Sequence, residues 1–582
     1  MKRILCLLLV LLFIAFSAVA EPIYSAGTYS AEAPGFGGPV KLEVEVTEDS
    51  IASVVVTEHT ETAQIGSLAV DLLPGIISES QTLADTVTGA TFTSNAILRA
   101  TEDALRQAGA GDDQIAALKE NLPAAAAPED CETDILVIGA GAAGMGAAIT
   151  AADEGVPVIL LEKMDITGGT TRLSDGCIWG VGSDTYAALQ QEFPDYNWSY
   201  TAEDIAKHVR EYSGGVLRNP ELLIRIAENS AYFLDYAVAN GNAMMHYMTP
   251  SNQVNRPYWR TALTANSGHG VAEVLTNMVS ERPIDLRLAN RATHLLTDED
   301  GNVIGCEVES AGGSYTIKAK KVILATGGIA YNDELMAQYC AGDYENSIKI
   351  ASVSNTGDGQ LMGVEVGGRI VGEGALGITC IGFDPSTNAS LWNPFLHVNT
   401  KGEKIMRSDQ YYPKVQEIIN DQEGGEVYTI YGSDSYNTET LESFVARGLM
   451  KKADSVEELA EALGIDADGL VATLEKHNAA ASAGIMDEFG SEPSTIKPVT
   501  QAPFYGCRRS ACIMGTIPGL EVDTMLRVVR EDGTPIGNLY AAGEVMFGNI
   551  MNDLYPMTGM AIASCWTGGR LAVLDAISTM AE

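Results

Sequence analysis

The sequence contains few residues that could hold a metal centre. Nine cysteines and seven histidines occur among 582 residues. No cysteines stand in the C-x-x-C-H pattern that attaches haem or in the paired C-x-x-C pattern that binds zinc, so we expect no metal site. Cys507 and Cys512 are the closest pair; they could form a disulfide in an oxidising compartment, or they could be two buried thiols.

Positive charge is also scarce. Lysine and arginine number 36 against 77 aspartates and glutamates, which gives a formal net charge of −41. This charge would repel nucleic acid and anionic membrane surfaces, so a polyanion-binding role is excluded.

Beyond the N-terminus the sequence has no apolar run long enough to cross a bilayer. Lys2 and Arg3 precede the apolar run Ile4–Phe16, and Ala18-Val19-Ala20 is a small-x-small cleavage site. This pattern predicts an export signal and a location at the cell surface or in the periplasm. If the run stays uncleaved, it would tether the chain to the membrane, because its length approaches that of a short span.

The run from Thr133 to Lys163 contains a strand, a glycine-rich turn, a helix and a second strand that ends in an acid. Gly139, Gly141 and Gly144 have the G-x-G-x-x-G spacing. In a dinucleotide-binding unit the first glycine forms the turn, the second lets the backbone approach a pyrophosphate, and the third lets the helix pack on the strand. The helix N-terminus offers N–H groups to the phosphates. Glu162 stands near the ~20-residue spacing of the acid that binds the ribose hydroxyls.

Three later glycine-rich segments extend this pattern: Thr167–Gly176, Lys320–Gly328 and Asn538–Glu544. Together with the first motif they resemble the FAD-containing superfamily of fumarate reductase, succinate dehydrogenase and ketosteroid dehydrogenase flavoproteins, which build one flavin domain from distant segments. The resemblance runs from about Thr133 to the C-terminus and implies non-covalent FAD. It assigns contacts with FAD to Gly139, Gly141, Ala143, Gly144, Glu162, Lys163, Gly169, Thr170, Thr171, Ser174, Gly176, Gly327, Asp358, Glu544, Ala561 and Ile562.

A smaller domain precedes the flavin domain. Residues 41–62 alternate apolar and polar side chains, which predicts two antiparallel strands. The segment Asp85–Thr91, DTVTGAT, resembles the flavinylation motif of FMN-binding domains, in which the last threonine carries FMN through a phosphoester. The resemblance makes Thr91 the acceptor of a covalent FMN, attached by a flavin transferase; a helix-capping turn is the alternative. Because the chain has no haem site, electrons would pass from a membrane-associated donor through this FMN to FAD.

The region expected to cover the substrate departs from the fumarate reductases. Their His-Pro-Thr stretch is missing around Glu373–Ile381, and their proton-donating arginine falls at Tyr412. A histidine and an arginine that bind the dicarboxylate are replaced at Cys512 and within Asn552–Pro556. Three arginines are possible substitutes: Arg407, Arg508 and Arg509.

The same region is similar to the ketosteroid dehydrogenase branch. Pro503–Leu520 and the turn Tyr555–Gly559 match its layout, in which the turn's tyrosine hydroxyl and glycine N–H bind a ketone oxygen. The resemblance implies that Tyr555 and Gly559 polarise a carbonyl while Tyr412, or its neighbour Tyr411, protonates the α-carbon. Two neutral donors would stabilise the enolate formed when hydride adds to a conjugated C=C bond. A buried core aromatic is the alternative for Tyr555.

The expected fold class is α/β, with an FAD-binding Rossmann-like domain of the glutathione-reductase type, an inserted α+β capping domain and a small α+β FMN-binding domain. An amphipathic helix is expected at 560–577, its N-terminus directed at the flavin. The expected boundaries are a signal peptide at 1–20, the FMN-binding domain at 24–118, a Pro/Ala linker at 119–131, the FAD-binding domain at 132–371 and 513–582, and the capping domain at 372–512.

The expected function is an exported FMN- and FAD-containing reductase that transfers hydride to a C=C bond conjugated to the carbonyl of a 3-ketosteroid-like or other enone. A first alternative is a reductase of an unsaturated carboxylate, of the fumarate, urocanate or cinnamate type, in anaerobic respiration. The others are a ketosteroid-type dehydrogenase and a flavin electron-transfer protein without a substrate of its own.

Overall fold

The computed structural model divides the chain into two compact units, residues 1–125 and 126–582. It describes residues 22–34, 39–59, 66–83, 91–120, 128–194, 198–213, 215–239, 246–248, 260–262, 267–340, 342, 346–382, 395–410 and 412–580. The predicted export signal lies outside these residues. Within them, no helix is both long and apolar enough to span a membrane, and no three metal-ligating side chains gather.

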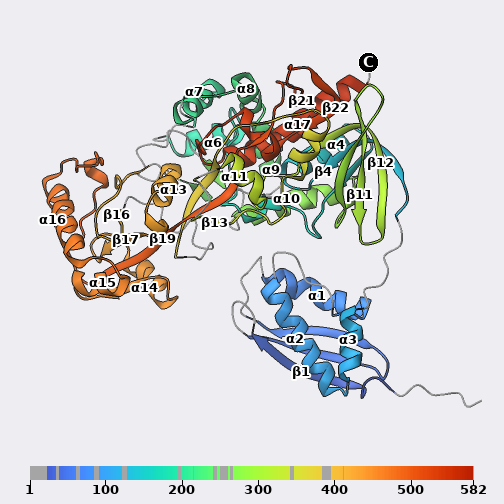
Figure 1. Cartoon of the computed structure of the whole chain (residues 1–582), viewed down its shortest axis with the longest axis horizontal. Coiled ribbons are helices and arrows are strands. Elements are labelled where there is room, and N and C mark those ends of the chain that lie inside the picture. Colours follow the sequence, from blue (N-terminus) through green and yellow to red (C-terminus); the bar gives the residue numbers. More distant parts are fainter. Residues whose placement is uncertain are drawn as a thin grey trace, which may run out of the picture. The chain divides into compact units, whose positions relative to one another are not determined.

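The first unit is a three-stranded antiparallel sheet covered on one face by helices (Figure 1). Its elements are β1 (Gly27–Pro34), β2 (Pro39–Val46), β3 (Ile51–Glu58), α1 (Gly66–Ser80), α2 (Thr91–Gln107) and α3 (Asp112–Glu120). The two strands predicted within 41–62 are confirmed as the β2–β3 pair. Val40, Leu42 and Val44 alternate along β2 and are buried, because every second side chain of a strand points to the same face.

The second unit is built on an eight-stranded sheet. Its main path runs β10-β11-β12-β4-β5-β9, and β22 pairs with β12 and with β21. The strands are β4 (Cys131–Ile138), β5 (Val158–Leu161), β9 (Asp285–Arg287), β10 (Arg291–Thr297), β11 (Val303–Ser310), β12 (Gly313–Leu324), β21 (Arg527–Val529) and β22 (Pro535–Ala541). Residues 285–326, whose pattern predicts strands, form β9 to β12. Parallel pairing of β5, β4, β12 and β22 brings their carboxyl ends to one edge of the sheet, where ligands of such sheets bind.

Helices cover this sheet, and a few short elements connect them. The helices are α4 (Ala142–Asp153), α5 (Gly169–Leu173), α6 (Asp184–Glu192), α7 (Ala202–Tyr212), α8 (Pro220–Glu228), α9 (Ala231–Ala239), α10 (Ser267–Ser280), α11 (Asp333–Tyr339), α12 (Asp358–Glu365), η4 (Gly543–Asn549) and α17 (Met560–Met580). The short strands are β6 (Cys177–Ile178), β7 (His246–Met248), β8 (Arg260–Ala262), β14 (Ile370–Val371) and β20 (Gly519–Leu520). The region between Gly182 and Met248 contains helices α6 to α9 and also contributes β7, which joins β6 and β8 in a sheet.

Helix α17 corrects one expectation. It is not amphipathic: Ile562, Ala563, Leu571 and Ala572 are all buried, although they point in four different directions around the helix. The reason is its position, because α17 packs against α4 along most of its length and also contacts α8 and η4. A helix enclosed by neighbours on several sides is apolar nearly all round.

The capping region is a second sheet with its own helices, seen in orange in Figure 1. Its elements are β13 (Ile348–Lys349), β15 (Ala375–Ile381), β16 (Leu396–Val398), β17 (Val427–Gly432), β18 (Lys451–Ala453), β19 (Phe504–Thr516), α13 (Tyr412–Asn420), η2 (Glu423–Gly425), α14 (Thr438–Ala446), α15 (Val456–Leu463), α16 (Ala467–Ala483) and η3 (Pro493–Thr495). The central strand β19 runs through the boundary predicted at 512. Cys507 and Cys512 are both free thiols on this strand; five positions apart, they point to opposite faces and cannot pair.

Candidate active site and cofactor pocket

An open cavity, with about 1240 Å³ of empty space including its solvent-filled mouth, lies at the carboxyl edge of the main sheet. Strand ends of β4, β5 and β12 and the first turns of α4, α5 and α17 form most of its wall, and the capping region adds Leu376 and Met514. Of the residues predicted to contact FAD, it is lined by Gly139, Gly141, Ala143, Glu162, Lys163, Gly169, Thr170, Thr171, Ser174, Gly176, Gly327, Asp358, Glu544, Ala561 and Ile562. Tyr555 and Gly559 line it too. The fold therefore collects segments that are up to 427 positions apart around one cavity, from Ile138 to Cys565.

Gly144 is the predicted contact that does not line the cavity, and its role is in packing. A Cβ at Gly144 would overlap the carbonyl oxygen of Gly139, so the bare backbone is what lets α4 lie against the turn. Gly139 has φ +105°, a conformation that favours glycine. A Cβ at Gly141 would meet no protein atom within 4 Å and would point into open space. That space is where a pyrophosphate would approach the backbone.

Glu162 is buried at the end of β5. Its two carboxylate oxygens accept hydrogen bonds from the backbone N–H of Ala140, at 2.8 Å, and of Met164, at 2.9 Å. Burial raises its pKa, an effect that these N–H donors oppose. Each oxygen keeps a second lone pair, so the carboxylate can still accept from ribose hydroxyls.

Lys163 forms an ion pair that joins two distant parts of the cavity wall. Its Nζ donates to Thr356 Oγ1 at 2.6 Å and to Asp358 Oδ2 at 3.0 Å. Asp358 also accepts from the Arg291 guanidinium, at 3.1 and 3.2 Å. Among the described residues that line the cavity, Lys163 and Arg291 are the cations, and both are paired with Asp358.

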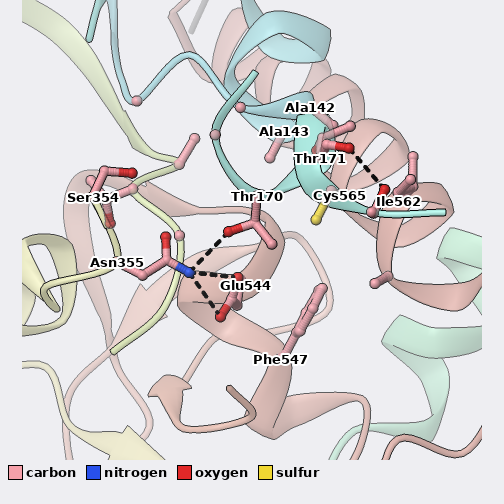
Figure 2. Close-up of a pocket in the computed structure, with 18 of the residues that line it drawn as sticks. Ala142, Ala143, Thr170, Thr171, Ser354, Asn355, Glu544, Phe547, Ile562 and Cys565 are labelled. Carbon is pink, nitrogen blue, oxygen red and sulfur yellow. Dashed lines mark hydrogen bonds between the residues drawn. The ribbon is translucent and has the colours of Figure 1, made fainter. Parts of the chain in front are cut away.

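Asn355 ties three segments together next to Glu544 (Figure 2). Its side-chain Nδ2 donates to Thr170 Oγ1 at 3.2 Å and faces both Glu544 oxygens at 3.3 and 3.4 Å. Glu544 Oε1 also accepts from the backbone N–H of Thr516 at 2.7 Å and from its hydroxyl at 3.0 Å. Burial raises the pKa of Glu544 to about 7, although these donors pull it down. Asn355 thus sets the spacing between α5 and η4.

The turn between η4 and α17 places Tyr555 and Gly559 at the cavity wall. Tyr555 is 7% exposed, and its hydroxyl oxygen accepts the backbone N–H of Ala561, in the first turn of α17, at 3.2 Å. Gly559 has φ +89°, and a Cβ there would press on the Trp179 ring at 3.0 Å. The wall of the same cavity also includes the apolar side chains of Leu376, Met514 and Phe547 and the thiol of Cys565.

The cavity suits FAD on two observations. Glu162 lines it, and its carboxylate can accept hydrogen bonds from ribose hydroxyls in addition to those from Ala140 and Met164. Gly141 leaves open space beside the first turn of α4, where N–H groups and the helix dipole attract phosphate. The residues that would hold FAD are therefore the glycine-rich turn and Glu162 for pyrophosphate and ribose, and Asn355, Thr170 and Glu544 further along the wall.

Some predicted site residues cannot be placed in the structure. Tyr411 lies outside the described residues, and Tyr412 is described only as the first residue of α13. Most of the flavinylation segment also lies outside, and Thr91 is described only as the start of α2. The roles of these three residues stay predictions.

The three candidate arginines have different surroundings. Arg407 forms an ion pair with Asp409 at 2.8 Å, and Arg508 forms one with Glu426 at 3.0 Å. Arg509 is 4% exposed on β19 and donates to Thr379 Oγ1 at 2.9 Å. None of the three lines the described cavity.

Sequence reasoning left three polar residues of the site without an assigned role. Asn355 is the first residue of the turn that contains Asp358. Its position directly before the sequence T-G-D-G could have indicated that it belongs to the site. Thr516 ends β19, and its bonds to Glu544 cross from the capping strand to η4. Asp175 lines the cavity beside Ser174 and Gly176; it stood inside a quoted glycine-rich segment without being assigned a role.

Comparison with known proteins agrees with this geometry. The family model described as FAD binding domain matches residues 134–562, and the one described as FMN-binding domain matches residues 35–106. Urocanate reductase of Eggerthella lenta is 28% identical over 552 residues, 89% of this chain and 87% of the relative.

Two solved structures share the fold. A flavocytochrome c3 fumarate reductase in its open conformation has a TM-score of 0.64 at 25% identity and covers 78% of this chain and 79% of its own. The 3-ketosteroid delta1-dehydrogenase of Sterolibacterium denitrificans has a TM-score of 0.62 at 19% identity, covering 77% of this chain and 100% of its own, a likeness in fold alone.

The two family models confirm the predicted resemblance and the pair of flavins. The FAD model and the two structures confirm the predicted fold class. The chain belongs to the FAD binding domain family, carries an FMN-binding domain ahead of it, and is a flavin-dependent oxidoreductase acting on CH–CH groups.

Proposed function

We propose that this flavoprotein reduces a C=C bond conjugated to a neutral carbonyl group, as in a 3-ketosteroid-like or other enone. The observation that carries the proposal is the hydrogen bond from the Ala561 N–H to the Tyr555 hydroxyl at the cavity wall. Because the hydroxyl oxygen accepts this bond, its own hydrogen points away from Ala561. The N-terminal dipole of α17 favours negative charge on that oxygen, which makes Tyr555 a better donor to a ketone.

The charges of the cavity wall also support a neutral substrate. The described lining residues include four carboxylates, Glu162, Asp175, Asp358 and Glu544. Both lining cations, Lys163 and Arg291, already pair with Asp358. An anionic substrate entering beside Tyr555 would lose its hydration without gaining a cation from this wall, and an uncompensated buried charge costs several kcal/mol.

When bound, FAD supplies the hydride that adds to the β-carbon, and FMN supplies the electrons for it. Tyr555 and the Gly559 N–H hold the carbonyl oxygen, and their donors stabilise the negative charge that develops on it. Tyr412, or Tyr411, gives a proton to the α-carbon; as a neutral acid with a pKa near ~10, tyrosine holds this proton at neutral pH. One hydride and one proton together saturate the bond.

A second candidate is the reduction of an unsaturated carboxylate. Arg509 favours it, because a buried guanidinium on the capping strand next to Thr379 offers the bidentate geometry that carboxylates prefer. The similarity to a urocanate reductase and a fumarate reductase supports the same candidate. The two candidates differ in the charge of the substrate, so charge is what the experiment must vary.

The test compares 4-phenylbut-3-en-2-one with cinnamate. Both carry the same phenyl group and the same C=C bond, but one ends in a methyl ketone and the other in a carboxylate. Each is added anaerobically to the purified two-flavin protein with a reduced viologen dye as electron donor, and dye oxidation gives kcat/KM. We expect the ketone to be turned over at least ~10-fold faster, since one unpaired buried charge costs more than ~1.4 kcal/mol.

Other outcomes decide against the proposal. Turnover of cinnamate, fumarate or urocanate without turnover of the ketone would make the protein a carboxylate reductase. Faster oxidation of a saturated 3-ketosteroid with an oxidised dye than reduction of its enone would make it a dehydrogenase. If the flavins accept electrons from the dye but pass them to none of these compounds, the protein would be an electron-transfer protein.

Replacing Thr91 by alanine should abolish covalent FMN and leave FAD bound. The physical reason is that the hydroxyl of Thr91 is the atom to which the proposed phosphoester is made, whereas FAD is held by the second unit. The measurement is flavin released and flavin retained after denaturation of protein made with a flavin transferase; Thr93→Ala, two positions along α2, is the matched control. Covalent FMN in the Thr91→Ala protein would rule out this attachment site.

The proposal also includes the surroundings of the protein. The chain would be exported through residues 1–20, and a flavin transferase would attach its FMN. A membrane-associated donor would supply the electrons. These three proposals are consistent, because a flavin on a small separate unit can be reduced from outside the flavin domain. The FMN-binding domain supports the transferase.

A further inference from the structure

A buried histidine contacts the turn that carries Tyr555. His208 lies on α7, and its Nε2 is 3.0 Å from the carbonyl oxygen of Pro556, 348 positions further along the chain. The side chain is 4% exposed. Pro556 directly follows Tyr555, so this contact acts on the peptide next to the proposed carbonyl-binding residue.

The contact defines which nitrogen of His208 carries hydrogen. A carbonyl oxygen can only accept, so Nε2 must be the donor. Burial lowers the pKa of His208, an effect that the bond to Pro556 opposes, and the ring is therefore neutral near pH 7 with its hydrogen on Nε2. The Tyr212 ring packs against it with the ring centres 4.4 Å apart, which restricts rotation of the imidazole.

Helix α7, which carries this histidine, is held in place by its N-terminal cap and by core packing. Thr201 and Asp204 form a capping box at its start, an arrangement that satisfies two N–H groups of the first turn. Ile205 and Val209, on either side of His208, are fully buried in the core of the flavin domain. The imidazole is thus held by a helix that cannot move without opening that core.

The turn itself is held on both sides of Tyr555. Before it, the Asp553 N–H donates to the carbonyl oxygen of Glu373 at 3.0 Å. After it, Ala561 donates to the Tyr555 hydroxyl. Proline has no N–H, so at residue 556 the carbonyl is the backbone group that can be bound, and His208 binds it.

We propose that His208 is a positioning residue for Tyr555, and that its Nε2–H···O bond to Pro556 keeps the tyrosine hydroxyl at the place where the substrate's carbonyl oxygen lies. This inference rests on the proposed function, since it assigns Tyr555 the carbonyl. A displaced donor stabilises the developing charge poorly, and misplacement by ~1 Å can lower a rate by ~10²-fold.

The test uses three substitutions of His208 in the holoenzyme. Glutamine places an amide nitrogen near the position of Nε2 and can still donate to Pro556; asparagine is too short to reach, and leucine has no donor. We expect His208→Leu and His208→Asn to lower kcat for the ketone ~10- to 100-fold per bound FAD, and His208→Gln to restore most of it. KM and FAD content should change little. Wild-type kcat in a folded, FAD-loaded His208→Asn protein would overturn the inference, as would equal losses in the asparagine and glutamine variants.

A double substitution separates this inference from the proposed function. If His208 acts through Tyr555, adding His208→Asn to Tyr555→Phe should lower kcat no further, because the donor that it positions is already gone. Losses that multiply would overturn the positioning role and leave Tyr555 as the carbonyl donor. A fully active Tyr555→Phe protein would overturn the proposed role of Tyr555 and, with it, this inference.

Discussion

Replacing Tyr555 by phenylalanine should lower kcat for the enone by ~10²–10³-fold, the loss found when one of two oxyanion donors is removed. The ring stays and fills the same buried space, so the cavity keeps its shape. What disappears is the hydroxyl that accepts from Ala561 and that is proposed to donate to the substrate. Anaerobic turnover with a reduced dye, normalised to bound FAD, measures the effect.

The matched control for this substitution is Tyr540→Phe. Tyr540 is also buried, and its hydroxyl is bound to Asp575 at 3.0 Å, but it does not line the cavity. Loss of its hydroxyl should lower thermal stability and leave kcat per folded enzyme unchanged. Equal kcat in Tyr555→Phe and wild type would show that the carbonyl is bound by other groups. Equal losses of kcat in Tyr555→Phe and Tyr540→Phe would point to a general effect of removing a buried hydroxyl.

Adding one methyl group should impair folding at Gly144 but FAD binding at Gly141. At Gly144 the new Cβ overlaps the Gly139 carbonyl oxygen and approaches the Ala325 side chain at 3.3 Å. Gly139 belongs to the glycine-rich turn and Ala325 directly follows β12, so α4 must move away from the sheet. We expect Gly144→Ala to lower the free energy of unfolding by ~3 kcal/mol or more, with little folded protein recovered.

Gly141→Ala should instead fold normally and lose FAD. Its Cβ meets no protein atom within 4 Å, so nothing in the protein has to move. The methyl occupies the space that a pyrophosphate needs, and we expect the Kd for FAD to rise ~10- to 100-fold, as for an extra methyl group in a packed site. Thermal melting of the apoprotein and FAD titration separate the two variants. A Gly141→Ala protein that melts like Gly144→Ala would contradict the assignment of that space to the cofactor.

Local pattern was enough to predict much of the flavin domain. The strand, turn and helix around Gly139, Gly141 and Gly144 follow from short-range rules, because each glycine is required by its immediate neighbours. The later strand-plus-glycine segments ending at Gly328 and Glu544 were recognisable for the same reason. That these segments share one cavity followed only from the resemblance to known flavoproteins.

Contacts between distant segments were not predictable from pattern. Helix α17 was expected to be amphipathic, and it is buried nearly all round because α4, α8 and η4 enclose it. The sequence also left open whether Cys507 and Cys512 pair. One strand, β19, holds both on opposite faces. The carboxylate of Glu544 was placed at the cavity, but its partners Asn355 and Thr516 come from segments 189 and 28 positions away.

The sequence alone therefore determined the kind of protein, a chain with an FMN-binding and an FAD-binding domain, because glycine turns and apolar strands are encoded by adjacent residues. Tertiary structure decided which side chains meet: Asn355 with Thr170 and Glu544, Ala561 with the Tyr555 hydroxyl, and His208 with Pro556. The physical reason is that a hydrogen bond depends on positions to within a few tenths of an ångström. Only the packing of these segments within the second unit sets those positions across hundreds of residues.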